Sequence, residues 1–126
     1  MHHSRLAGFI IDCNTDDLEK AAEFWSAALG YALKPQDQET SPKYRQLATG
    51  SDELHIEVQS VAHESRVHLD IESDDIEAEV KRMEALGAKR IAHVHTWCVM
   101  EAPTGQRFCV VRPQRPGIES KEYARD

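Results

Sequence analysis

With 126 residues, the chain has the length of one domain and can bury a hydrophobic core without disulfides to staple it. Its composition, 40% hydrophobic and 29% charged, is ordinary for a globular protein and argues against a disordered chain. The 22 acidic residues outnumber the 15 basic ones, and the net charge of −7 argues against nucleic acid or an anionic membrane surface as a partner.

Three cysteines, Cys13, Cys98 and Cys109, are widely spaced and lie in apolar runs. Their odd number and spacing indicate buried thiols in a reducing compartment, and therefore a cytoplasmic location. No apolar run approaches the ~20 residues of a membrane span, and residues 1–5 lack the apolar region of a signal peptide. The sequence thus predicts no membrane partner.

The first predicted elements are a strand over 6–13 and a helix that follows it. Asp16 and Glu19 form a candidate capping box at the start of the helix, and Gly30 occupies its expected left-handed C-terminal cap. A polar connection runs from Pro35 to Pro42. The remaining strands of this half are predicted at 31–34, 44–48 and 53–58.

The second half repeats this order, with a strand over 66–72 and a helix over 74–86 whose capping glutamate is Glu77. The apolar stripe of this helix consists of Ile76, Val80, Met83 and Leu86. Three further strands are predicted at 89–94, 97–101 and 107–111. After residue 113 the chain is polar, and 118–125 reads either as a short helix or as a fraying end.

The two halves are an internal repeat with an offset of 58 positions (70 − 12). Four acidic pairs are identical at this offset: Asp12 and Asp70, Asp16 and Asp74, Asp17 and Asp75, Glu19 and Glu77. Two copies of this length indicate a duplicated β-α-β-β-β module rather than a solenoid. The prediction is one domain over 1–113, built from modules at about 5–60 and 65–113, with a polar tail over 114–126.

Strand side chains alternate between faces, so the sequence separates an apolar face from a polar one. The apolar face, expected under the helices, carries Phe9, Ile11, Cys13, Leu54, Ile56, Val58, Val67, Leu69 and Ile71. The opposite face carries Ile10, Asp12, His55, Glu57, Gln59, His68, Asp70 and Glu72. This carboxylate-rich face either lines a ligand groove or is a solvated sheet surface.

Several motifs follow one another along the chain: Asp16-Asp17-Leu18, Phe24-Trp25, Leu29-Gly30, the segments 66–71 and 85–88, and the segment 101–111. In this order they resemble the vicinal oxygen chelate superfamily of glyoxalase I, bleomycin-resistance proteins and extradiol dioxygenases, and especially its small glyoxalase-like members. The resemblance implies an α+β fold in which two tandem βαβββ modules form a half-open mixed β barrel flanked by helices. It also implies a homodimer and a small-molecule ligand.

The resemblance places the superfamily's four metal-ligand positions on Ile10, Glu57, His68 and Cys109. Ile10 cannot bind a metal and Cys109 replaces the expected carboxylate, so the predicted ligands are His68 and Glu57. Asp12, one pleat from Ile10, is a possible substitute in a shifted site. The ion, where one binds, is Zn, Ni, Mn or Fe.

The substrate-binding residues are predicted to be Asp12, His55, Asp70, Trp97 and Cys109. Each candidate has a structural alternative: His68 as a hydrogen-bonded pocket histidine, Glu57 as a salt-bridge partner, and Cys109 as inert packing or a nucleophile. The His93-Val94-His95 pair has metal-compatible spacing that two surface histidines would also show.

The resulting hypothesis is a glyoxalase-like protein that binds a small molecule in an acidic groove. Two alternatives stay open: a divalent-metal-dependent lyase, isomerase or dioxygenase of the glyoxalase I type, and a metal-free resistance or sequestration protein for a cationic drug.

Overall fold

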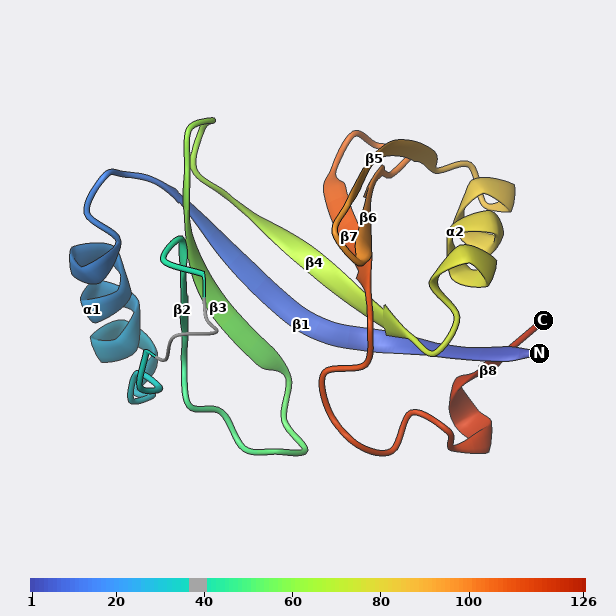
Figure 1. The fold of residues 1–126 in the computed structure, drawn as a ribbon, viewed down its shortest axis with the longest axis horizontal. Helices are drawn as coiled ribbons and strands as arrows, with labels where there is room; N and C mark the ends of the chain where they lie inside the picture. The colour runs from blue at the N-terminus through green and yellow to red at the C-terminus, as the bar shows by residue number, and fades with distance from the viewer. Residues whose placement is uncertain (37–40) are drawn as a thin grey trace. The chain divides into compact units, whose positions relative to one another are not determined.

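The computed structural model describes residues 1–36 and 41–126 and divides into two compact units. The N-terminal unit is Phe9–Val67, and the C-terminal unit combines Met1–Gly8 with His68–Asp126. Two long strands, β1 (His2–Asn14) and β4 (Arg66–Ser73), contribute residues to both units (Figure 1). Part of the predicted 35–42 connection, residues 37–40, lies outside the described residues.

The N-terminal unit contains one helix and the strands beside it. These are α1 (Leu18–Leu29), β2 (Tyr44–Gln46) and β3 (His55–Val61), with the strand order β2-β3-β1. Helix α1 packs on β2 and β3 (Figure 1). The strand predicted at 31–34 is reduced to a single bridge between Leu33 and Leu47. Because Pro35 has no N–H to donate, it cannot extend this pairing.

The C-terminal unit repeats this organisation. Its elements are β4, α2 (Ile76–Ala85), β5 (Lys89–Val94), β6 (Trp97–Glu101), β7 (Arg107–Val111), the 3-10 helix η1 (Lys121–Tyr123) and β8 (Ala124–Arg125). The strand order is β4-β7-β6-β5, with β4 and β7 parallel and the other pairs antiparallel. The predicted bounds of β5, β6 and β7 are confirmed. The tail contributes β8, which pairs with the start of β1.

Both helices begin with an aspartate cap one residue later than predicted. The carboxylates of Asp17 and Asp75 accept hydrogen bonds from backbone N–H groups in the first turns of α1 and α2. In α2 this leaves the preceding residue, Asp74, to accept a hydrogen bond of 2.7 Å from the backbone N–H of His3. Neither helix in the described part of the chain is long and apolar enough to span a lipid bilayer.

The core of the C-terminal unit lies between α2 and one face of its sheet. It consists of Val80, Met83, Cys98, Met100, Phe108 and Val110. Two residues predicted to be buried are exposed instead, Leu86 at 66% and Leu69 at 44%. Helix α2 has ten residues, about 15 Å of length, and packs on β5, β6 and β7, so Leu69 on β4 is left largely uncovered.

In the N-terminal unit the predicted division between a buried apolar face and an open polar face is also wrong in part. Val67 is 60% exposed, whereas Ile10 and Asp12, predicted on the polar face, are each 3% exposed. Consecutive residues of β1, Ile10, Ile11 and Asp12, are thus all buried, so both faces of the strand are covered here.

Two glycines offer a matched test of these helix ends. Gly87 has φ +107° and a Cβ added there would lie 3.2 Å from Pro103 Cγ, whereas Gly30 has φ +78° and open space around it. Gly30→Ala should therefore lower the free energy of unfolding by about 1 kcal/mol, the strain of a left-handed backbone. Gly87→Ala should lower it by about 2 kcal/mol, because the contact with Pro103 adds packing strain. Urea unfolding measures both, and equal losses would contradict the role of Pro103.

Candidate functional site

Three of the predicted site residues, Asp12, His55 and Glu57, lie in the N-terminal unit. Each lies close to a polar or charged side chain of that unit. The Nε2 of His55 lies 2.7 Å from Oε1 of Glu57, and its Nδ1 lies 3.1 Å from Nε2 of Gln46. The carboxylate of Asp12 lies 4.0 Å from the Nε of Arg66. Glu57, predicted as a metal ligand, is thus a partner of His55, an arrangement that pairs a histidine with a carboxylate on one strand.

The other predicted residues lie on one face of the sheet in the C-terminal unit. Asp70 on β4 is in register with Cys109 on β7, and Cys109 is in register with Val99 on β6. Because Cys98 and Met100 of β6 point into the core beneath α2, Val99 and its partners occupy the opposite face. We call this the triad face. It carries His68, Asp70, Trp97, Val99, Glu101, Arg107 and Cys109.

Three side chains on the triad face converge. The ligand atoms of His68, Asp70 and Cys109 all lie within 4.8 Å of one another. The Nε2 of His68 lies 3.6 Å from Oδ1 of Asp70. Their side chains are 14% and 10% exposed, and Cys109 is partly buried. We call these three residues the triad.

The triad offers two kinds of chemistry. A histidine beside a thiol can take up its proton and make it a nucleophile, whether or not a carboxylate orients the histidine. Alternatively, the three side chains can hold a metal ion. Two ligands on a tetrahedral ion with metal–ligand distances of about 2.0–2.3 Å are separated by roughly 3.3–3.8 Å. The 3.6 Å between Nε2 of His68 and Oδ1 of Asp70 lies in this range, and the three ligand atoms together lie within 4.8 Å of one another.

The donor set also fits a metal. Imidazole nitrogen, thiolate sulfur and carboxylate oxygen are the three ligand types that zinc accepts, and three protein ligands leave a fourth position for a substrate oxygen. A thiolate disfavours magnesium and calcium, which take oxygen ligands. The residues present therefore fit a borderline-soft divalent ion.

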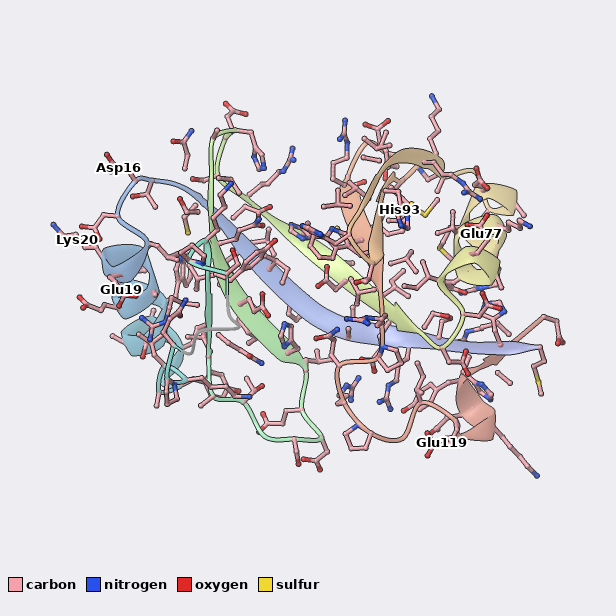
Figure 2. All side chains as sticks on the ribbon, in the orientation of Figure 1. Asp16, Glu19, Lys20, Glu77, His93 and Glu119 are labelled. Atoms are coloured by element: carbon pink, nitrogen blue, oxygen red, sulfur yellow. The ribbon has the colours of Figure 1, made fainter. Side chains whose placement is uncertain are left out.

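The histidine pair of the β5–β6 hairpin does not join the triad. His95 lies in the turn with φ +48°, and its ring packs 5.5 Å from that of Trp97. His93, labelled in Figure 2, is in register with Cys98 and so belongs to the face covered by α2. The two histidines have different surroundings and do not form the shared strand face that the sequence predicted.

Arg107 and Glu101, two charged residues at one end of the triad face, were not among the predicted site residues. The Nε of Arg107 donates a hydrogen bond of 3.3 Å to Oε1 of Glu101, with which it is also in register. Lys89 of β5 lies on the other side of Glu101. Arg107 precedes Cys109 by two positions, so strand alternation alone would have identified it as a neighbour.

The carboxylates of the predicted polar face are all close to basic groups of their own unit. The pairs are Asp12 with Arg66, Glu57 with His55, Asp70 with His68, and Glu72 with both Arg5 and Arg115. Arginine offsets the negative charge of Asp12 and of Glu72, whereas a histidine offsets that of its partner only when it is protonated. The negative charge offered to a cationic ligand is therefore smaller than the number of carboxylates suggested.

A family model described as "Glyoxalase-like domain" matches residues 8–111. No curated protein matches the sequence. Among solved structures, hypothetical protein BH1468 from Bacillus halodurans C-125 is similar at TM-score 0.63 and 12% identity, covering 90% of this chain and 97% of that one.

Two further solved structures share the fold. Methylmalonyl-CoA epimerase from Mycobacterium tuberculosis has TM-score 0.61 and 16% identity, covering 86% of this chain and 87% of its own. A glyoxalase/bleomycin resistance protein/dioxygenase superfamily member from Vibrio splendidus 12B01 has TM-score 0.51 and 16% identity, covering 85% and 98%. These identities are low, so the likeness concerns the α+β fold and not the activity.

Proposed function

Because this chain belongs to the glyoxalase-like domain family, we propose that it binds a small oxygen-bearing molecule at the triad, where His68, Asp70 and Cys109 hold a divalent metal ion. The observation that carries this proposal is the convergence of the three ligand atoms within 4.8 Å on one sheet face. Of the functions that the sequence left open, we therefore prefer the metal-dependent enzyme. The proposed metal ligands are the three residues of the triad in place of the predicted His68 and Glu57.

A bound divalent ion would supply Lewis-acid polarisation of a substrate oxygen. The protein residues have separate tasks. Asp70, the most deeply buried of the triad, contributes a negative charge that offsets the cost of placing an ion there. Val99 and the half-buried Trp97 give the same face apolar surface, which favours the carbon skeleton of a ligand and excludes water from its contacts.

We expect the protein, purified without affinity metals, to bind one zinc ion. His68→Ala should weaken the zinc affinity at least about 100-fold, because one of three ligands is lost. Zinc at 100 times its dissociation constant should stabilise the wild type by about 2.7 kcal/mol. Titration calorimetry and thermal melting measure both effects. The matched control is His93→Ala, an exposed histidine on the opposite face of the same unit, which should bind zinc like the wild type.

Alkylation of the cysteines gives an independent test of the same site. Zinc should protect Cys109 from iodoacetamide, as read from the labelled peptides by mass spectrometry, because a coordinated thiolate is no longer a free nucleophile. Burial raises the pKa of the Cys98 thiol, which makes it a slowly reacting internal reference. Equal labelling of Cys109 with and without zinc, or equal zinc affinity in His68→Ala, would refute the metal site and favour the metal-free binding protein.

We also propose a homodimer and a cytoplasmic location, both predicted from the sequence. The homodimer is expected from the family resemblance, and light scattering at micromolar concentration tests it. The cytoplasmic location rests on the three cysteines, Cys13, Cys98 and Cys109, which are not joined to one another by disulfides in the described part of the chain.

A further inference from the structure

The end of the triad face that carries Arg107 is more open than the triad. The side chains of Arg107 and Glu101 are 37% and 31% exposed, against 14% and 10% for His68 and Asp70. Arg107 and Glu101 are therefore the more solvent-exposed part of the triad face among these four residues. A group of the ligand that stays near solvent would lie beside Arg107.

Charge at this end is positive. Glu101 lies between Arg107 on β7 and Lys89 on β5, in register with both. One carboxylate between two cations leaves a net charge of +1 in this row of side chains. The row therefore favours an anionic group over a cationic one.

The guanidinium of Arg107 is only partly used. Its Nε donates the 3.3 Å hydrogen bond to Glu101, which is long for a charge-assisted pair. Its two Nη groups, which form the fork that matches a carboxylate, make no hydrogen bond to any residue within 1–36 or 41–126. Glu101 thus holds one side of the guanidinium and leaves the carboxylate-binding side available.

We propose that Arg107 binds a carboxylate of the ligand while the other end of the same ligand occupies the triad. This inference rests on the proposed function and names its substrate class, a small dicarboxylic acid with a further oxygen beside one carboxylate. Positions 107 and 109 are two residues apart on β7, about 7 Å. A flexible arginine and a ligand of four or five carbons bridge such a distance.

The test compares two probes, 2-oxoglutarate and pyruvate. Both carry a 2-oxo acid end suited to the triad, and only 2-oxoglutarate carries a second carboxylate. On the zinc-loaded protein, titration calorimetry should show 2-oxoglutarate binding about tenfold more tightly than pyruvate, the increment of one charged hydrogen-bonded pair. Arg107→Met should abolish this preference, Arg107→Lys should retain part of it, and neither should change the zinc affinity.

The control is Arg112→Met, an exposed arginine just after β7 that alternation places with Phe108 and Val110 on the opposite face. It should keep the full preference. A preference that is absent from the wild type, or is equal in Arg107→Met, overturns the inference even where zinc binds normally.

The same titrations on metal-free protein separate the two proposals. If zinc does not bind, the metal site fails, and an Arg107-dependent preference for 2-oxoglutarate would still support the carboxylate site. Without that preference both proposals fail.

Discussion

Glu72→Ala is expected to lower the free energy of unfolding by about 3–5 kcal/mol, because it leaves the buried Arg5 and the partly buried Arg115 without this carboxylate. Glu72 is fully buried and accepts hydrogen bonds of 2.5 Å from Nε of Arg5 and 2.6 Å from the backbone N–H of Gln114. The Nε of Arg115 lies 3.6 Å from the same carboxylate. Urea unfolding of the wild type and the variant measures the loss.

This carboxylate also fastens the C-terminal tail to the start of β1. Arg5 donates hydrogen bonds to the backbone carbonyls of Arg115 and Pro116, and its guanidinium lies 4.9 Å from the centre of the Tyr123 ring. Without Glu72, these contacts lose the charge that orients Arg5. Limited trypsin digestion should therefore cut the tail of Glu72→Ala, at Lys121 or Arg125, faster than that of the wild type.

The control is Glu101→Gln, which removes a half-exposed carboxylate with one 3.3 Å hydrogen bond. Exposed ion pairs contribute about 0–1 kcal/mol, so this variant should unfold close to the wild type. A Glu72→Ala variant no less stable than Glu101→Gln would show that the tail is held by other contacts.

The fold was predictable because the chain gives local signals for most of it. The repeat aligned Asp12 with Asp70, and the strands 89–94, 97–101 and 107–111 were located to the residue. The helix caps shifted by one position because Asp16-Asp17 and Asp74-Asp75 each offer two adjacent aspartates, and backbone geometry selects the second. Exposure of Leu69 was not predictable, since it depends on where α2 packs.

The site was predictable only in part. His68, Asp70 and Cys109 were all named as candidates, and alternation placed His68 beside Asp70. The neighbour relation of Asp70 and Cys109 comes from the parallel pairing of β4 with β7, for which a sequence carries no local signal. The charged partners of each carboxylate are equally remote in sequence, as Arg5 and Glu72 show. Their pairing is why the number of carboxylates alone did not predict the charge around each of them.

A second large effect is expected from pH, through the buried carboxylate of Glu79. Burial alone would raise the pKa of Glu79, but hydrogen bonds from Arg82, His2 and Ser4 outweigh it and hold the pKa below its usual value. The contacts are 2.7 Å to His2 and 2.8 Å to two nitrogens of Arg82. Glu79 is therefore charged in the folded protein at a pH where it is already protonated in the unfolded chain.

The sign of the effect follows from this depressed pKa. The unfolded chain, with a glutamate pKa of about 4.3, binds the proton first as the pH falls, so the stability contributed by Glu79 is complete above about pH 5. It is lost as the pH falls through the folded-state pKa. Glu79→Gln should cost about 3 kcal/mol at pH 7, and the gap to the wild type should narrow steadily below pH 4.

Urea unfolding between pH 3 and pH 7 measures this gap. Glu119→Gln is the control, because Glu119 is an exposed carboxylate of the tail (Figure 2) and its variant should follow the wild-type profile throughout. A gap between the wild type and Glu79→Gln that stays constant down to pH 3 would contradict the assignment of the acid sensitivity to Glu79.

Asp74 should contribute to the same loss of stability at low pH. Burial opposes ionisation of Asp74, but hydrogen bonds from the backbone and the ring of His3 lower its pKa. The partners His2 and His3 are adjacent on β1, so the two carboxylates hold neighbouring residues of one strand. Asp74→Asn combined with Glu79→Gln should therefore deviate from additivity at pH 7, since losing either contact loosens the strand that the other holds. That coupling should weaken as the pH falls and the two carboxylates become protonated.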